Sequence, residues 1–242
     1  FKFDPARVLS EEQLVQLKMD RPKVGSMYNK PTEDTSRVGT PDFDARSIAG
    51  DYERDLGELI SRYPGMPRPV SGRHHCVVWS DWSTGARAAG EHGLRFDTNY
   101  YYWPPDWVND TPGHFTGSAM PMRFADLDGT LIDVYQAATQ LTDESGQSYP
   151  FTIDTLLDRA LGPEQQFGAY TVNAHTDPSF VPIHDAVVQS ALARGVPVIT
   201  GRQILAWLDA RNASSFADLG WDGSTLGFTV SAAAAANELR AL

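Results

Sequence analysis

The sequence predicts an α/β protein in which helices cover largely parallel strands. Between residues 167 and 211, strand-like and helix-like segments alternate, an order typical of parallel strands joined by helical crossovers. Two apolar runs also end in polar clusters, at residues 97–99 and 173–177, as at the ends of parallel strands where ligands bind. Together these observations predict a site built at strand ends.

The composition is that of a globular protein with one large core. The chain has 242 residues, of which 41% are hydrophobic and 21% charged. Its formal net charge of -11 argues against a nucleic-acid partner, because such proteins gather Lys and Arg to contact phosphates. No apolar run reaches the length of a membrane crossing, so we expect no membrane span.

The single cysteine and the first residue bear on the cellular setting. Cys76 has no second cysteine to pair with, which excludes an internal disulfide and a cysteine-based zinc cluster within one chain. We expect it to be a small buried strand residue. The chain starts at Phe1 without Met, as after removal of a signal segment or at another processing boundary, and we expect a secreted or extracellular protein.

In the first half of the chain, hydrophobic spacing and breaker residues mark helices and strands in turn. Residues 1–41 are mostly loop, with one short helix. Gly65 and Gly93 follow helix-like segments and are expected to end them. The predicted helices are Ser10–Lys18, Asp42–Tyr63 and Ser83–His92, and the predicted strands are Val70–Trp79 and Leu94–Tyr102.

The second half begins with a predicted hairpin and ends with another. Asp128-Gly129 joins the apolar segments 122–125 and 130–137, and Asp222-Gly223 is the turn within Ser215–Ser231. Thr200 is the expected N-cap of the last helix. Between the hairpins we predict helices at Phe151–Leu161, Ile183–Arg194 and Gln203–Arg211, and strands at Phe167–Ala174 and Val196–Ile199.

Residues 42–211 resemble the polysaccharide deacetylase family, also called the NodB homology domain. The resemblance lies in the order of the pieces: a helix and strand leading to Arg73, a helix, glycine and strand ending at Asp97-Thr98, a hairpin at 121–134, and His175 at a strand end. A helix, a short strand and a last helix close the pattern over residues 183–208.

The resemblance implies a distorted (β/α) barrel over residues 42–212, with hairpin additions. Residues 1–41 would then be an N-terminal extension or truncated first barrel elements, and residues 213–242 a C-terminal hairpin and tail. The family's early Asp-Asp and His-x-x-x-His motifs have no counterpart here, since no histidine precedes His74. Either the domain begins upstream of this chain, or the usual metal site has been lost.

In such deacetylases, a divalent metal polarises the carbonyl group, an aspartate takes a proton from water, and a histidine protonates the leaving amine. The resemblance implies His175 as this acid, with Asp97 or Asp177 as base or metal ligand; Asp177 is alternatively a residue that orients His175. Arg73 is expected to hold a carboxylate such as that of Asp97. A locally bonded strand-end histidine and a plain salt bridge are the structural alternatives.

His75 is a candidate second imidazole of the site. With Asp97 and His175 it would complete a set of two histidines and one carboxylate, which suits zinc or another divalent metal. We also expect His92 to cap a helix end and His184 to open a helix, with structural roles only. No bound metal at all is the alternative.

The loop at residues 100–107 holds three tyrosines and two tryptophans, residue types that stack on sugar rings. Such aromatic clusters also pack as small cores beneath loops. The candidate substrate-binding residues are Tyr101, Trp103, Trp107 and Trp79.

Three functions fit this sequence. The first is a hydrolase that removes acetyl groups from a glycan with the help of a metal. The second is a non-catalytic carbohydrate-binding or structural relative that has lost the metal. The third is a metal-dependent amidohydrolase acting on a small non-sugar amide.

Overall fold

The computed structural model describes residues 45–73, 81–99, 120–143, 147–163, 165, 168–175 and 177–233. Its contacts divide the chain into two compact units, which consist essentially of residues 3–198 and 199–242. The described part is mixed α/β, and its strands form three small sheets. Those described strands close no barrel, so the distorted barrel stays a prediction. The predicted helix at 10–18 lies outside the described residues.

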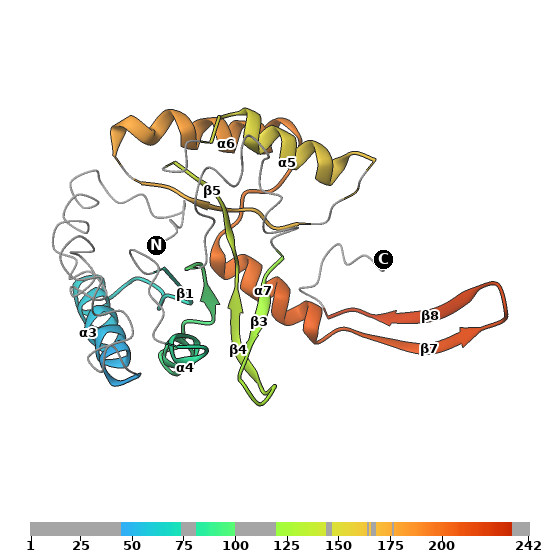
Figure 1. Ribbon diagram of the computed structural model, residues 1–242, viewed down its shortest axis with the longest axis horizontal. Coiled ribbons are helices and arrows are strands. Elements are labelled where there is room, and N and C mark those ends of the chain that lie inside the picture. Colours follow the sequence, from blue (N-terminus) through green and yellow to red (C-terminus); the bar gives the residue numbers. More distant parts are fainter. Residues whose placement is uncertain are drawn as a thin grey trace. The chain divides into compact units, whose positions relative to one another are not determined.

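The first sheet of the larger unit has four strands in the order β1-β2-β4-β3 (Figure 1). Its strands are β1 (Ser71–Gly72), β2 (Phe96–Asp97), β3 (Met122–Ala125) and β4 (Leu131–Gln136). β2 pairs in parallel with both β1 and β4, whereas β3 and β4 form an antiparallel hairpin. Its turn passes through Gly129 with a φ of 85°, which a glycine adopts without strain. The predicted hairpin at Asp128-Gly129 is therefore confirmed.

The second sheet pairs β5 (Thr139–Thr142) in parallel with β6 (Thr171–Asn173). β5 begins only two residues after β4, so one stretch of chain serves both sheets (Figure 1). The sequence analysis ended this strand at Ala137 and assigned no structure to residues 138–150. β5 is therefore an element that the sequence reasoning missed.

Helices cover the two sheets in pairs. α3 (Ala45–Arg62) and α4 (Thr84–Glu91) share a buried apolar cluster, and so do β5, α5 (Phe151–Leu161) and α6 (Val181–Ala193). Leu141 of β5 has no exposed surface in the second cluster. A short 3-10 helix, η5 (Pro178–Phe180), leads into α6. The second cluster consists of Leu141, Ile153, Leu156, Leu157, Val187 and Ala191.

The ends of α4 follow from local hydrogen bonds. Oδ1 of Asp81 accepts from the backbone N of Ser83 at 3.1 Å and of Thr84 at 2.8 Å, which satisfies donors at the helix start. At the other end, His92 is the C-cap, and its Nδ1 lies 2.7 Å from the carbonyl oxygen of Ala88. The predicted capping role of His92 is confirmed.

Three strand predictions need correction within the described residues. The predicted strand Val196–Ile199 is wrong: these residues form no strand, and Val198 is 59% exposed. An apolar run of four residues has no partner strand here, because the backbone N of Val196 bonds to Ala191 at the end of α6 instead. The predicted strands at 94–102 and 167–174 are also too long, since β2 and β6 cover only 96–97 and 171–173.

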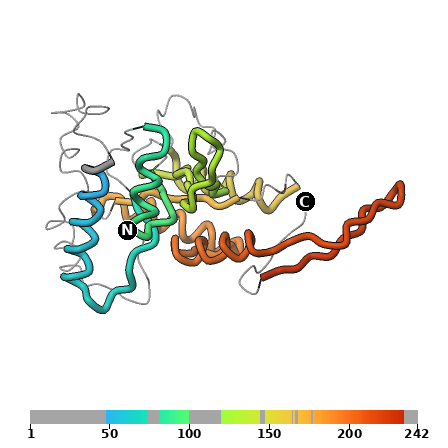
Figure 2. Tube along the Cα trace, turned by 90° about the horizontal axis from the view of Figure 1, so that it is seen from below, coloured from blue at the N-terminus to red at the C-terminus, as the bar shows by residue number. Residues whose placement is uncertain are grey.

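The smaller unit consists of α7 (Gly201–Asn212) followed by the hairpin β7 (Ser215–Trp221) and β8 (Leu226–Ser231) (Figure 2). Thr200 caps α7 in a capping box: its side chain accepts from the backbone N of Gln203, and Gln203 accepts from the backbone N of Thr200. Both the cap and the terminal hairpin are confirmed predictions.

Candidate functional site

The neighbouring strands β5 and β6 end side by side, and each is followed by a polar residue. Thr142 of β5 lies opposite Asn173 of β6. Asp143 is the first residue after β5, and His175 is the second after β6. Since the strands are parallel, the two side chains meet at the same edge of the sheet.

The carboxylate of Asp143 is fully buried and receives three N–H groups. Oδ2 accepts from the backbone N of His175 at 2.6 Å, and Oδ1 lies 2.8 Å from Nδ1 of the same residue. Nε2 of His184, in the first turn of α6, lies 3.2 Å from Oδ2. The side chain of Asp143 has 0% exposure, against 33% for His175 and 25% for His184.

These contacts keep Asp143 ionised. Burial alone raises the pKa of this carboxyl, but the hydrogen bonds from His175 and His184 outweigh it and hold the pKa below its ordinary value. An ionised carboxylate can only accept hydrogen bonds, so Nδ1 of His175 must carry a proton. Nε2 is then the ring nitrogen of His175 that can gain or lose a proton while the bond to Asp143 is kept.

Side chains of the following loop hold the end of β5 in place. Gln147 bonds to the strand in both directions: it accepts from the backbone N of Thr142 at 3.3 Å and donates to the carbonyl of Gln140 at 3.0 Å. The hydroxyl of Tyr149 donates to the carbonyl of Thr142 at 3.1 Å. The residue just before Asp143 is thereby fixed by its own loop.

Asp97 ends β2 and is also buried, but its surroundings differ. Its Oδ1 accepts from the backbone N of Asn99 at 2.8 Å, and its Oδ2 from Nδ2 of Asn99 at 2.7 Å. Burial raises the pKa of Asp97 to about 6, and the Asn99 bonds and the charge of Arg73 only partly oppose it. A carboxyl with such a pKa exists in both protonation states near neutral pH.

Arg73 precedes both of these carboxylates in the sequence and follows β1 directly. Its Nη1 donates to Oγ1 of Thr139 at 3.1 Å, at the start of β5, while its charge lowers the pKa of Asp97. Both described side-chain bonds of the Asp97 oxygens come from Asn99, so the expected bidentate pair of Arg73 and Asp97 is not seen among them. Arg73 thus links the residue after β1 to the start of β5.

Asp97 and His175 lie beside different parts of the continuous stretch formed by β4 and β5. Asp97 pairs with Gln136, whereas the backbone N of His175 bonds to Asp143, seven residues further along. That is up to about 23 Å of extended chain. In the ranges that the structure describes, no group of three His, Cys, Asp or Glu residues is placed to hold a metal ion.

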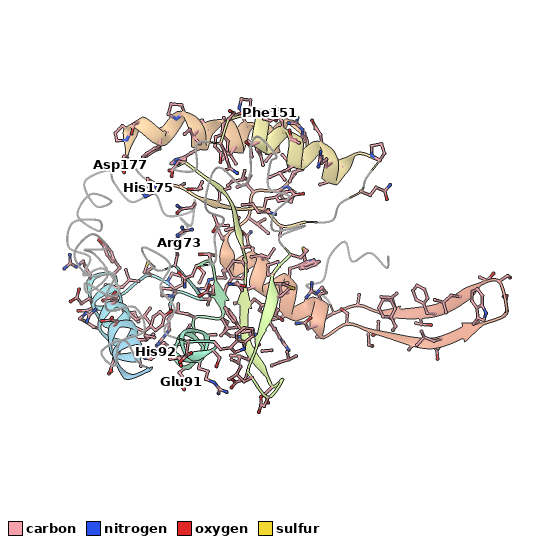
Figure 3. All side chains as sticks on the ribbon, viewed as in Figure 1. Arg73, Glu91, His92, Phe151, His175 and Asp177 are labelled. Carbon is pink, nitrogen blue, oxygen red and sulfur yellow. The ribbon has the colours of Figure 1, made fainter. Side chains whose placement is uncertain are left out.

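Asp177 follows His175 by two residues and is half-buried (Figure 3). It is the N-cap residue of η5, and its carbonyl oxygen accepts from the backbone N of Phe180. The ring of Phe180 lies 5.5 Å from that of His175. Asp143 bonds to both the backbone N and Nδ1 of His175, and the expected orienting role of Asp177 stays a prediction.

Five of the predicted site residues lie outside the described residues. They are the metal-ligand candidate and the aromatic substrate-binding candidates, namely His75, Trp79, Tyr101, Trp103 and Trp107.

Sequence reasoning missed two residues of the site. Asp143 follows an apolar strand as Asp97 does, and the same signal could have found it had the strand been continued past Ala137. His184 was expected only to open a helix. Its contact with Asp143 spans 41 positions, and no local pattern reveals such a contact.

Comparison of the chain with protein-family models, with curated proteins and with solved structures found no match. Of the helices in the described ranges, none has the length and apolar character needed to cross a membrane.

Proposed function

We propose that the protein is a hydrolase that removes acetyl groups from a glycan, with His175 as its general acid. The observation that carries this proposal is the buried Asp143 carboxylate 2.8 Å from Nδ1 of His175, at the ends of two parallel strands. A carboxylate in this position fixes the tautomer and orientation of a catalytic imidazole. The resemblance of residues 42–211 to polysaccharide deacetylases supplies the substrate class.

The proposed reaction assigns one proton to each of two groups. A water oxygen adds to the acetyl carbon, and the bond from that carbon to the sugar nitrogen or oxygen breaks. His175 acts in its doubly protonated form: Nε2 gives its proton to this leaving atom, the ring becomes neutral, and Nδ1 keeps its proton and its hydrogen bond to Asp143. We assign the proton lost by water to Asp177, because Asp97 ends a strand of the other sheet and both its oxygens accept from Asn99.

A divalent metal would polarise the acetyl carbonyl and activate the water. The proposed ligands are His75, Asp97 and His175, but the described residues do not bring three such donors together. No step of the proposed reaction is therefore assigned to the metal. Metal binding stays a prediction that depends on His75.

Acetate release tests the proposed function. The purified chain would be incubated with acetylated chitooligosaccharides, an O-acetylated glycan, and small acetamides and formamides. We expect acetate from the glycans and a fall of about 100-fold or more in His175→Ala, the usual scale of losing a general acid. His92→Gln, which changes a histidine of the α4 cap, should keep the activity.

The same assay separates the alternatives. Equal acetate release by wild type and His175→Ala would contradict the role of His175. Turnover of the small amides alone would indicate the amidohydrolase. A wild type that releases no acetate from any substrate, yet binds chitooligosaccharides in EDTA, would indicate the non-catalytic relative.

A further inference from the structure

We propose that His184 is a second positioning residue of this site, which holds the Asp143 carboxylate in the orientation that keeps the proton of His175 on Nδ1. The inference rests on the proposed function only for its effect on rate. Its structural part concerns the tautomer of one imidazole and stands independently of any substrate.

The first argument is that His184 reaches Asp143 from a different element. Two of the three N–H groups on the carboxylate come from His175 itself, which lies after β6. The third comes from His184 of α6, whose Nε2 is 3.2 Å from Oδ2. Of the three described bonds to the carboxylate, this one ties its plane to a residue other than the one it orients.

The second argument concerns the freedom of the carboxylate. Rotation about the last side-chain bond of an aspartate has a broad, roughly two-fold profile, so hydrogen bonds must choose its angle. The side chain of Asp143 has 0% exposure, and loss of a donor there leaves an acceptor without a ready water replacement. Without His184, the carboxylate can turn away from the angle that serves Nδ1.

The third argument concerns the loop between β6 and α6. His175 lies near its start and His184 just beyond it, in the first turn of α6, and both imidazoles contact Asp143. One carboxylate therefore closes a segment of ten residues on itself. Asp177 and Phe180 lie inside this closed segment, and the Phe180 ring contacts His175. Removing His184 should loosen the surroundings of His175 as well as its bond.

The test measures the tautomer of His175 directly. The full chain, labelled with ¹⁵N-histidine, would be studied by long-range ¹H–¹⁵N NMR at a pH where the ring is neutral. We expect His175 in the wild type to be protonated on Nδ1 alone. In His184→Phe it should become a mixture of Nδ1–H and Nε2–H forms. His184→Gln offers an amide donor in place of Nε2 and should restore the wild-type tautomer.

Two further variants keep the result decisive. His184→Asn has an amide too short to reach Asp143 and should behave like His184→Phe, even where the phenylalanine variant does not fold. Asp185→Asn changes an exposed neighbour on α6 and should leave the tautomer unchanged. Retention of the Nδ1–H form alone in His184→Asn and His184→Phe would overturn the proposal.

The rate gives the second readout. We expect kcat for acetate release to fall about tenfold in His184→Asn with KM nearly unchanged, a smaller loss than that of the acid itself. Recovery of kcat in His184→Gln would support positioning. A wild type without acetate release would contradict the proposed function alone, because the NMR result still decides the role of His184.

Discussion

Asp97 and Asp143 are both buried aspartates at strand ends, yet their pKa values move in opposite directions. Burial raises the pKa of Asp97 to about 6, since the Asn99 bonds only partly offset it. Around Asp143, three N–H groups outweigh burial and lower the pKa. Groups of one type whose environments separate their pKa values are candidates for different tasks in a site. Here Asp143 is suited to hold an imidazole as a permanent anion.

The raised pKa of Asp97 predicts a loss of stability as pH rises. Its folded pKa of about 6 exceeds the ordinary 3.8, so the folded state binds more protons between these values. The contribution is fully present below about pH 4 and lost by about pH 6 to 7. A shift of this size corresponds to roughly 3 kcal/mol.

Asp97→Asn cannot ionise and should escape this loss. Urea unfolding of both proteins would be measured at pH 4 and pH 7. Between these pH values, the free energy of unfolding of wild type should fall relative to that of Asp97→Asn by roughly 3 kcal/mol. Any pH-independent effect of the substitution on the free energy of unfolding is the same at pH 4 and pH 7, so it cancels in this comparison. A difference that stays constant with pH would show that Asp97 titrates normally.

Asp143→Asn should have the opposite pH dependence. Because the folded pKa of Asp143 is lowered, its contribution is present above its ordinary value of about 4 and is lost as pH falls through the lower folded value. Loss of a hydrogen bond to a buried charged group lowers the free energy of unfolding by roughly 1.5–3 kcal/mol. Urea unfolding at pH 6 should show wild type more stable than the variant, and at pH 3 the gap should narrow.

A gap between wild type and Asp143→Asn that widens on acidification would contradict the lowered pKa. The comparison is made between two proteins that both keep Asp97, so the titration of that residue cancels.

At the scale of elements, the extended stretch from β4 to β5 organises the site. β2 pairs with its first part and β6 with its second, and Arg73 bonds to Thr139 near the middle. The positions of Asp97 and His175 are therefore set by how β2 and β6 pair with this one stretch. A shift of register along it would move Asp97 and His175 together with their strands.

The hairpin of the smaller unit depends on a bulge. Two residues of β7, 218 and 219, stand opposite one residue of β8 between the pairs Ala217–Thr229 and Gly220–Gly227. The bulge brings Phe216 and Trp221, five positions apart, to one face; without it, alternation would place them on opposite faces. The rings of Phe216 and Phe228 accordingly meet edge to face at 5.2 Å.

The capping box of α7 makes a prediction about helix stability. Thr200→Ala removes the side chain that accepts from the backbone N of Gln203 and should cost about 1 kcal/mol in the free energy of unfolding. Thr200→Ser keeps a capping hydroxyl and should cost much less. Urea unfolding followed by far-ultraviolet circular dichroism measures both, and equal losses in the two variants would argue against the cap.

At the scale of the whole molecule, local chemistry decided which parts of the fold could be predicted. The hairpins at Asp128-Gly129 and Asp222-Gly223, the cap at Thr200 and the end of α4 at His92 each follow from a few neighbouring residues. The strand predicted at 196–199 failed because strands need partners, and an apolar run carries no information about its partner.

The candidate site was predictable to the same extent. The sequence pattern identified His175 as a polar residue after an apolar strand. It did not identify the hydrogen-bond partners of His175. Asp143 lies 32 positions before its partner His175, and His184 lies 41 positions after its partner Asp143. Only the fold brings these residues together.

The central claim is that Asp143 and His175 act as one catalytic unit, and a double-mutant cycle tests it most directly. Acetate release from the best glycan substrate would be measured for wild type, Asp143→Asn, His175→Gln and the double variant. Residues that act as a unit have non-additive effects. We predict that Asp143→Asn lowers kcat by about 100-fold or more and that it has almost no further effect in the His175→Gln background. A double variant in which the loss of kcat equals the product of the two single-variant losses would contradict the account.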